Sequence, residues 1–296
     1  MRILFLGDIV GRAARHGVLA VLPSLIKELA ADFTIINGEN AAGGFGITPA
    51  IADEFFAAGT DVVTTGNHVW DRREIIPYID DQPRLIRPLN MVDVKAGKGS
   101  VVVTKNQKRL MVINCMTNLF MPDSDNMFEV LAGCLAKYAL AQQAPTKSKG
   151  KTKSQPHAIV IDVHGEATSE KTATGLFVDG RVSLVVGTHT HVPTSDHRIL
   201  PKGTAFISDV GMCGDYASVI GMDAEVAIGR FTHVLDNSNG NSNSNGRLRV
   251  GMGTPSICGV VVDTDDATGL AQGIYPLRRG GCLSEVTPPP PSPTHT

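Results

Sequence analysis

The chain has 296 residues, a length that fits one large domain or two small ones. Hydrophobic residues make up 42% and charged residues 19%, so the chain can bury a sizeable core and is not globally disordered. The 27 Lys and Arg residues are balanced by 29 Asp and Glu residues, for a formal net charge of −2. That balance argues against a protein that wraps duplex nucleic acid, because such binding needs many cationic contacts to phosphates.

The sequence contains no feature of an exported or membrane protein. No run of about 18 apolar residues is present, so we expect no membrane span. The apolar run near the start covers residues 3–6 and is too short for a signal peptide. The 5 cysteines are scattered and contain no CxxC pair, which indicates unpaired thiols in a reducing compartment. We therefore expect a cytoplasmic protein. The sequence is also compatible with a homo-oligomer.

The first part of the chain alternates short apolar runs with amphipathic stretches. Strands are predicted at residues 2–6, 33–36 and 61–65. A helix is predicted over residues 18–29, and Pro23 inside it means that the helix is either kinked or begins late. Thr48 and Pro49 predict the N-cap and first turn of a helix that runs to Ala58. These elements are typical of an α/β protein.

After residue 66 the predictions continue in the same way. Asp71 and Glu74 predict a capping box for the next helix. Residues 100–104 and 109–114 predict a hairpin around Asn106 and Gln107. A helical stretch is expected near residues 127–141. Further strands are predicted at residues 158–163, 182–186, 204–208, 258–263 and 270–277.

Three segments look different from the rest of the chain. Residues 144–156 are rich in Lys, Ser, Thr and Pro, and residues 237–246 alternate Asn, Ser and Gly, so both are predicted to be exposed inserts. The proline-rich tail, residues 287–296, is predicted to be disordered. The remainder, residues 1–280, is predicted to be one domain with two sheets between helical layers.

Polar residues gather at the ends of the predicted strands. In open α/β sheets the carboxyl ends of strands are where functional sites collect. A lone Asp after a strand is more often a turn or helix cap, and a lone His is more often a packed or exposed side chain. Because five strand-end loops carry such groups, it is much less probable that all of them have only these structural roles. They hold Asp8, Glu39, Asn40, Asn67, His68, His164, His189 and His191.

This set of donors predicts a metal site. Carboxylates, amides and imidazoles suit Mn²⁺, Fe or Zn²⁺ better than a metal selected by thiolates. Two divalent ions bring four positive charges, and Asp8 with Glu39 return two negative ones, so the centre stays positive and suits a phosphate ester. A carboxylate that bridges two ions fits the two-metal arrangement, with the ions about 3.5–4 Å apart.

At these residues the sequence resembles the calcineurin-like metallophosphoesterases, and more narrowly their YmdB-type bacterial branch. The resemblance covers about residues 1–277, without the two inserts. It rests on five motifs that together are highly specific, and that lie at residues 7–11, 37–42, 66–71, 164–171 and 187–192. The resemblance implies a four-layer α-β-β-α sandwich that carries a dinuclear metal site.

Position by position, the resemblance also implies roles for the residues. One metal ion would take Asp8, Glu39, Asn40 and His191, and the other would take Glu39, Asn67, His164 and His189. Glu39 would bridge the two ions, and His68 matches the proton donor of the family. The branch is similar to enzymes that hydrolyse cyclic nucleotides, 2′,3′-cyclic ones included, with iron or manganese. A metal-bridging hydroxide would attack phosphorus in line.

The sequence departs from the wider superfamily at two places, and both departures agree with the YmdB-type branch. The usual Asp-x-His start is Asp8-Ile9-Val10 here, so Asn40 takes the place of the missing imidazole. Val69 rather than a carboxylate follows His68. Asp71 is then a candidate to orient His68, in competition with its predicted role as a helix cap.

Other functions are compatible with the same ligands. The site would also suit a phosphomonoesterase or a nuclease, since metal ligands do not set the size of the substrate. A regulatory, RNA-associated protein with little catalytic activity is the non-enzymatic alternative. The presence of His68 beside a full ligand set favours an enzyme over that alternative. The function that we expect is a phosphodiesterase that acts on a small phosphodiester.

Several weaker candidates keep two readings. The loop of Gly43, Gly44 and Gly46 either lets backbone approach a phosphate or is a mobile loop. Trp70 is more often a core residue than a platform for a base. Three basic residues either contact the substrate phosphate or lie on the solvated surface, namely Arg12, Arg15 and Lys171.

Overall fold

The computed structural model describes residues 1–140, 155–232 and 249–290. Its first sheet has five strands, which run across the sheet in the order β13-β12-β1-β3-β4. The pairings of β1 with β3 and of β3 with β4 are parallel, whereas β12 pairs antiparallel with β1 and with β13. The strands are β1 (Arg2–Leu6), β3 (Phe33–Asn37), β4 (Val62–Thr64), β12 (Ile257–Thr264) and β13 (Ala271–Arg279).

The second sheet has six strands in the order β5-β6-β7-β8-β10-β9. Strands β6, β7, β8 and β10 are parallel to their neighbours in that run, and the two edge strands are antiparallel. The strands are β5 (Ser100–Lys105), β6 (Lys108–Met116), β7 (Ala158–His164), β8 (Leu184–Thr188), β9 (Arg198–Ile199) and β10 (Ala205–Ile207). A short parallel ribbon joins β2 (Asp8–Ile9) to β11 (Met212–Cys213).

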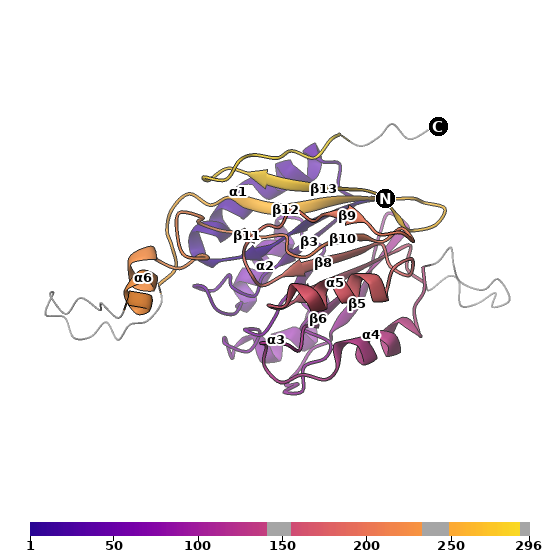
Figure 1. Ribbon diagram of the computed structural model, residues 1–296, viewed down its shortest axis with the longest axis horizontal. Helices are drawn as coiled ribbons and strands as arrows, with labels where there is room; N and C mark the ends of the chain where they lie inside the picture. Colours follow the sequence, from indigo (N-terminus) through magenta and orange to yellow (C-terminus); the bar gives the residue numbers. More distant parts are fainter. Residues whose placement is uncertain (141–154, 233–248, 291–296) are drawn as a thin grey trace, which may run out of the picture.

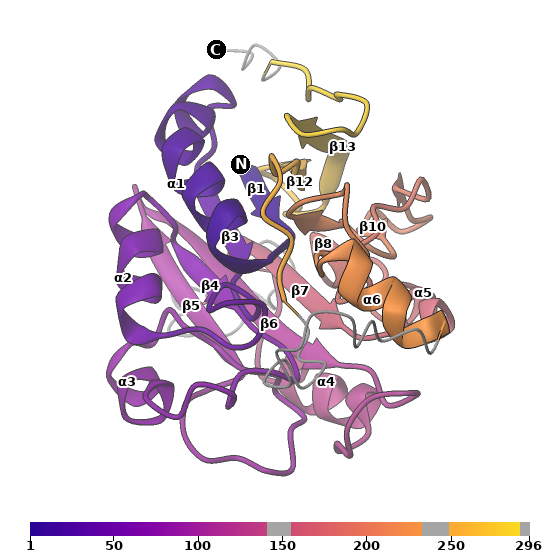
Figure 2. The same cartoon turned by 90° about the vertical axis from the view of Figure 1, so that its left-hand side faces the viewer.

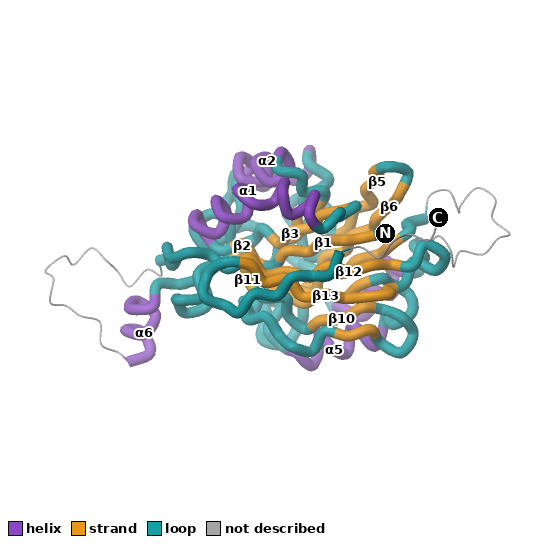
Figure 3. Tube along the Cα trace, turned by 90° about the horizontal axis from the view of Figure 1, so that it is seen from above, coloured by secondary structure: helices purple, strands orange, loops and turns teal. Residues whose placement is uncertain are grey.

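Helices cover the outer face of each sheet. Helices α1 (Gly11–Glu28), α2 (Pro49–Ala57) and α3 (Ile75–Asp81) pack on the first sheet. Helices α4 (Met127–Leu135) and α5 (Thr168–Phe177) lie on the second sheet, so that α1 and α5 are on opposite sides (Figure 2). Helix α6 (Ala224–Thr232) stands away from both sheets (Figure 1, Figure 3).

Three separate apolar cores lie between these four layers, and they follow from the alternation of side chains along each strand. In β1, Leu4 and Leu6 face the core under the helices α1 to α3, whereas Ile3 and Phe5 face the core between the sheets. In β7, Val160 faces the same central core, and its neighbours face the core under α4. The predicted four-layer α-β-β-α sandwich is therefore confirmed.

Two local predictions are also confirmed. The Thr48 hydroxyl accepts a hydrogen bond from the backbone N–H of Ile51 at 3.3 Å, which caps α2 as expected. Asn106 and Gln107 connect β5 to β6 with φ values of 50° and 63°. Positive φ at both turn residues matches the right-handed twist of a two-residue hairpin.

Three predicted helix boundaries are wrong. Helix α1 begins at Gly11, well before Pro23, so it does not start late. The capping box does not form, because Glu74 makes no side-chain cap and Asp71 instead bonds His68. Helix α4 ends at Leu135 rather than near residue 141. Beyond the helix, the backbone N–H of Ala139 donates to the side-chain oxygen of Gln155 and not to a carbonyl oxygen of the helix.

The predicted inserts fall almost entirely outside the described residues, and so do residues 291–296 of the tail. The described part of the tail contacts the body of the protein, since the Arg2 guanidinium donates to the carbonyl oxygen of Pro289 at 2.6 Å. All five cysteines are free thiols. Among the helices of the described ranges, none combines the length and apolar character that a membrane span requires.

Candidate metal centre

The predicted ligands meet at one edge of the sandwich, where the parallel strands of both sheets end. Asp8 lies in β2, just after β1, and Glu39 and Asn67 follow β3 and β4 of the first sheet. His164 is the last residue of β7, and His189 directly follows β8 of the second sheet. Each sheet therefore supplies part of the cluster, as expected for loops at the carboxyl ends of strands.

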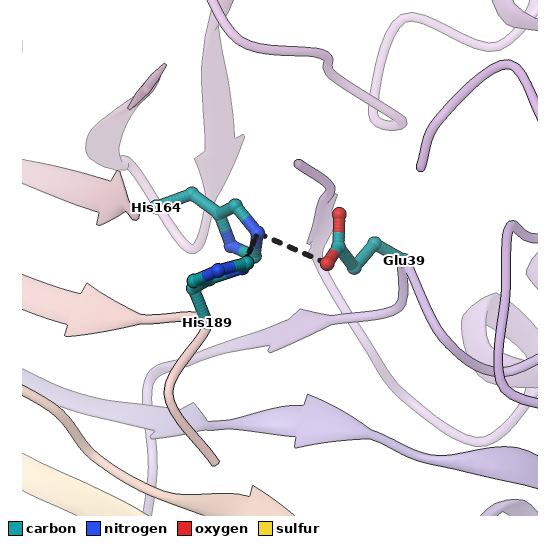
Figure 4. Close-up of side chains that lie close together, drawn as sticks. All are labelled: Glu39, His164 and His189. Carbon is teal, nitrogen blue, oxygen red and sulfur yellow. Dashed lines mark hydrogen bonds and ion pairs between the residues drawn. The ribbon is translucent and has the colours of Figure 1, made fainter. Parts of the chain in front are cut away.

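Glu39, His164 and His189 form the centre of the cluster (Figure 4). Their donor atoms all lie within 4.8 Å of one another. The His164 Nε2 atom is 2.9 Å from Glu39 Oε1, 3.1 Å from His189 Nδ1 and 3.2 Å from Asn67 Oδ1. His164 therefore contacts the other three residues predicted for the same metal ion.

The remaining predicted ligands join this group through Glu39, Asn40 and the backbone of His189. The Asn40 Nδ2 atom is 3.3 Å from Glu39 Oε1 and 3.1 Å from His191 Nε2. Asp8 Oδ2 accepts a hydrogen bond from the backbone N–H of His189 at 3.1 Å. All seven predicted ligands are thus connected by direct contacts. Glu39, which was predicted to belong to both groups, contacts a member of each.

Hydrogen bonds behind the cluster fix which nitrogen of each imidazole faces it. The Thr188 hydroxyl donates to Asp162 Oδ1 at 2.7 Å, so it accepts from Nδ1–H of His164 at 2.9 Å. His191 donates its own Nδ1–H to the carbonyl oxygen of Ile220 at 2.7 Å. In both rings Nε2 faces the cluster. Metal-binding histidines typically donate the other ring N–H to an oxygen acceptor in this way.

The sequence analysis missed Asp162. This carboxylate is fully buried in the middle of β7 and also accepts hydrogen bonds from Thr64 at 2.5 Å and Asn37 at 3.1 Å. Burial raises the pKa of Asp162 to about 6 despite these donors. One signal was available in the sequence, namely an acidic residue inside an otherwise apolar strand.

The electrostatics of the cluster favour a positive charge at its centre. Burial opposes the charge on Glu39, but the neighbouring imidazoles, His164 first, bring the pKa of its carboxyl down to about 2. Burial likewise opposes charge on His164, but Glu39 and then Asp8 raise its pKa to about 9. Burial and then His164 lower the pKa of His189 to about 3, which leaves that ring neutral with a lone pair to share.

The residues fit divalent cations by two further observations. Asp8 Oδ1 and Asn40 Oδ1 are buried, and neither takes part in a hydrogen bond with any of the described residues. Buried polar atoms almost always have partners. Two buried oxygen acceptors without hydrogen bonds beside a histidine cluster therefore indicate a place that a cation can bind. Oxygen and imidazole donors are also the set that suits borderline divalent metals.

His68 lies beside the cluster rather than in it. Its backbone N–H donates to Glu39 Oε2 at 3.3 Å, and its Nδ1 atom is 2.9 Å from Asp71 Oδ2. This contact resolves the competition over Asp71: the side chain orients His68 and does not cap a helix. The other ring nitrogen of His68 is then available for the cavity that the residue lines.

A cavity of about 470 Å³ opens over the cluster. Clefts of roughly 300–1,000 Å³ are typical of sites for small molecules. Four residues of the cluster line the polar side of the cavity, namely Glu39, Asn40, His189 and His191. His68, Thr190 and Glu166 complete that side, and the Glu166 carboxylate is 3.7 Å from His189 Nε2. Its apolar side is formed by four side chains, namely Phe45, Val192, Ile220 and Met222.

Lys171 has a role that neither reading of the sequence anticipated. Its ammonium group is fully buried and donates to the carbonyl oxygen of Thr188 at 2.7 Å and to Asp209 Oδ2 at 2.9 Å. The same Asp209 oxygen accepts from the backbone N–H of Thr190 at 3.0 Å. This buried ion pair therefore holds both sides of His189, whose φ of 96° is strained for a residue other than glycine.

The other weak candidates lie outside the cluster. Arg12 is exposed on α1, and Arg15 pairs with Glu54 of α2 at 3.5 Å. Trp70 packs against the core under α1 to α3, and its indole N–H donates to the carbonyl oxygen of Asp93 at 3.1 Å. The core reading of Trp70 is the one that the structure supports.

The sequence model of the YmdB-like protein family matches residues 4–277, which is nearly the whole chain. The chain belongs to the YmdB-like protein family. This confirms the predicted family. Membership, together with the histidine and carboxylate cluster, indicates divalent metal ions as the cofactor class of this YmdB-like protein.

Individual relatives agree with that assignment. A 2′,3′-cyclic-nucleotide 2′-phosphodiesterase of Bacillus subtilis (strain 168) is 46% identical over 268 residues, which cover 90% of this chain and 93% of the relative. The crystal structure of a novel phosphatase from Mycoplasma pneumoniae aligns with a TM-score of 0.80 at 30% identity, over 97% of this chain and 95% of the other. The predicted enzyme class, a phosphodiesterase, is confirmed for the YmdB-like chain by this relationship.

A more distant structure shows the fold alone. A putative 5′-nucleotidase from Staphylococcus aureus, in complex with α-ketoglutarate, aligns with a TM-score of 0.53 at 15% identity. The match covers 96% of this chain and 56% of the nucleotidase chain. The YmdB-like chain therefore has the phosphoesterase fold that the resemblance implied.

Proposed function

We propose that this protein hydrolyses cyclic nucleotides, 2′,3′-cyclic ones included, at a dinuclear metal site of iron or manganese. The observation that carries the proposal is the joining of seven predicted ligands, five of them buried, into one network with two buried oxygen atoms that lack hydrogen-bond partners among the described residues. The relative from Bacillus subtilis, whose name states this substrate and the cleavage of the 2′ bond, supports the substrate class. A reducing compartment such as the cytoplasm completes the proposal, since five thiols are free.

The proposed ligands divide into two groups. Asp8, Glu39, Asn40 and His191 would hold one ion, and Glu39, Asn67, His164 and His189 would hold the other. When bound, such ions lower the pKa of water and neutralise charge on phosphoryl oxygens. Glu39 suits the shared position, because one of its oxygens already contacts both His164 and Asn40.

The residues of the chain then have separate tasks. The cluster and the backbone around it fix the phosphodiester group at the polar side of the cavity. His68, oriented by Asp71 through Nδ1, presents Nε2 as the atom that protonates the leaving alkoxide. For a 2′,3′-cyclic substrate that alkoxide is the ribose 2′ oxygen, so the P–O2′ bond breaks and a 3′-phosphomonoester forms.

The proposal is tested by metal analysis and turnover on the same preparation. Protein purified without oxygen and loaded with iron or manganese should contain close to two ions per chain. It should convert 2′,3′-cyclic AMP to the 3′-monophosphate, and His68→Ala should lose that activity while keeping the metal. Protein that holds two ions and releases no monophosphate from any cyclic nucleotide would show that the substrate class is wrong.

A further inference from the structure

The glycine-rich loop beside the cluster has no role in the chemistry described so far. Gly43, Gly44 and Gly46 have φ values of 73°, 93° and 76°, a region where other residues are strained. Between the last two stands Phe45, the one residue of the loop with a side chain. The three glycines therefore build a turn that displays a single aromatic ring.

Hydrogen bonds from Arg72 and to Asn40 fix the conformation of this turn. The Arg72 guanidinium donates from Nε to the carbonyl oxygen of Phe45 at 3.1 Å and from Nη2 to the carbonyl oxygen of Ala42. The backbone N–H of Gly44 donates to the carbonyl oxygen of Asn40 at 3.0 Å, so it is not free to bind a phosphate. A side chain at position 44 would lie 2.7 Å from Val250, which makes glycine necessary there.

Phe45 lines the cavity over the cluster. It meets the His68 ring edge-on, with the centroids 5.0 Å apart and the ring planes at 73°. Val192 and Ile220, which continue the same apolar wall, expose about half of their surface, 52% and 53%. Exposed apolar side chains that gather at one place and are rimmed by polar residues often mark a ligand-binding groove.

We propose that Phe45 is the platform on which the nucleobase of the substrate stacks. The inference rests on the proposed function and extends it, because a cyclic nucleotide has one charged group and one flat aromatic group. The metal-ligand side of the cavity takes the phosphodiester, and the wall of Phe45, Val192 and Ile220 takes the base. Stacking on an aromatic ring tolerates any base, so the platform selects nucleotides over base-free diesters without selecting among bases.

The test compares a nucleotide with a base-free ester of the same reacting group. The substrates are 2′,3′-cyclic AMP and 1,2-propanediol cyclic phosphate, both five-membered cyclic phosphodiesters. Phe45→Leu should lower kcat/KM for cyclic AMP roughly tenfold more than for the base-free ester, within the range of a lost stacking contact. The difference should appear in KM, and Phe45→Trp should restore it. Phe120→Leu is the matched control, because Phe120 is 86% exposed and does not line the cavity.

Two outcomes would overturn the platform. Equal losses on the two substrates would mean that Phe45 only supports His68, and no loss on either would mean that the base lies elsewhere. Failure of the proposed function is recognised separately, as absence of turnover in the metal-loaded wild-type protein. In that case the Kd of 3′-AMP for wild type and Phe45→Leu, measured by calorimetry, decides the matter: a Kd weakened roughly tenfold supports the platform, and an unchanged Kd refutes it.

Discussion

Glu39 differs from the other proposed ligands because its carboxylate contacts both groups. Glu39→Gln keeps the shape of the side chain but removes the charge, so we expect the occupancy of both ions to fall together. Asn40→Ala should chiefly reduce one. Elemental analysis of the purified variants gives the two stoichiometries directly. Glu54→Gln, which alters a carboxylate paired with Arg15 on the surface, serves as the control and should keep both ions.

If Glu39→Gln binds as much metal as the wild-type protein and retains its turnover, the shared position belongs to another residue. Asp8 would then be the alternative, since its Oδ1 atom is the other buried carboxylate oxygen near His164, at 3.8 Å from Nδ1.

His68 is predicted to act as an acid, and its effect should depend on the leaving group. A ribose alkoxide needs a proton as the P–O bond breaks, whereas a nitrophenolate is stable as an anion. His68→Ala should therefore slow hydrolysis of a cyclic nucleotide by roughly 10²–10⁴-fold and slow bis(p-nitrophenyl) phosphate much less. Asp71→Asn should give a smaller loss of the same kind, because it weakens the 2.9 Å contact that orients the ring.

The measurement is kcat/KM for both substrates, with metal content determined on the same samples. A loss that is equal for the two esters, or that follows missing metal, would assign His68 to the shape of the site and not to proton transfer.

Helix α5 contributes to the centre through one buried side chain. Replacement of Lys171 by Met leaves Asp209 without its cation in a fully buried place, so we expect the free energy of unfolding to fall by about 3–5 kcal/mol. Metal content should fall as well, because the backbone on both sides of His189 loses its support.

The control for this change is Lys95→Met, which breaks an ion pair with the exposed Asp93. Exposed pairs contribute about 0–1 kcal/mol, so this variant should unfold at nearly the same denaturant concentration as the wild-type protein. A Lys171→Met variant that is destabilised no more than the control, with full metal content, would show that the loop of His189 keeps its conformation without the ion pair of Lys171 and Asp209.

The comparison of these elements with the sequence shows which features local patterns encode. Strands were predictable because an apolar run ends in a polar loop. The proposed ligands could be selected from the sequence because they stand in those loops. The hairpin at Asn106 was predictable because its turn needs positive φ at two adjacent residues. Each of these depends on neighbours along the chain.

Features that depend on distant partners were not predictable in this way. From the sequence, Asp71 could either cap a helix or contact His68. The structure shows that it contacts His68. Lys171 looks like a surface residue until Asp209, 38 positions later, is found beside it. Asp162 likewise acquires its role from Thr188 in the neighbouring strand. Such second layers behind a site come from the pairing of strands and helices, which a single sequence does not state.

The whole sandwich should gain stability from its ions, because the proposed ligands come from both sheets. Ions that bind only the folded chain stabilise it by mass action, about 2.7 kcal/mol at a concentration 100 times the Kd. Removal of metal with a chelator should then lower Tm by roughly 5–10 °C for a domain of this size. Differential scanning calorimetry with and without the chelator measures the change.

The Glu39→Gln variant provides the control, since a site that has lost its ions has little left to lose to the chelator. An equal fall of Tm in both proteins would mean that the chelator acts elsewhere, and an unchanged Tm in the wild-type protein would exclude ions that tie the two sheets together.

The same spacing of ligands has a consequence for the order of events during synthesis. Asp8 and His189 are 181 residues apart, and β1 at the N-terminus pairs with β12 near the other end of the chain. A growing chain on the ribosome therefore exposes the first ligands long before their partners exist. If the proposed ligands hold the ions, the full set assembles only after β8 has emerged and docked, and metal loading would follow folding of the second sheet. The metal content of a preparation then counts the molecules that have finished folding.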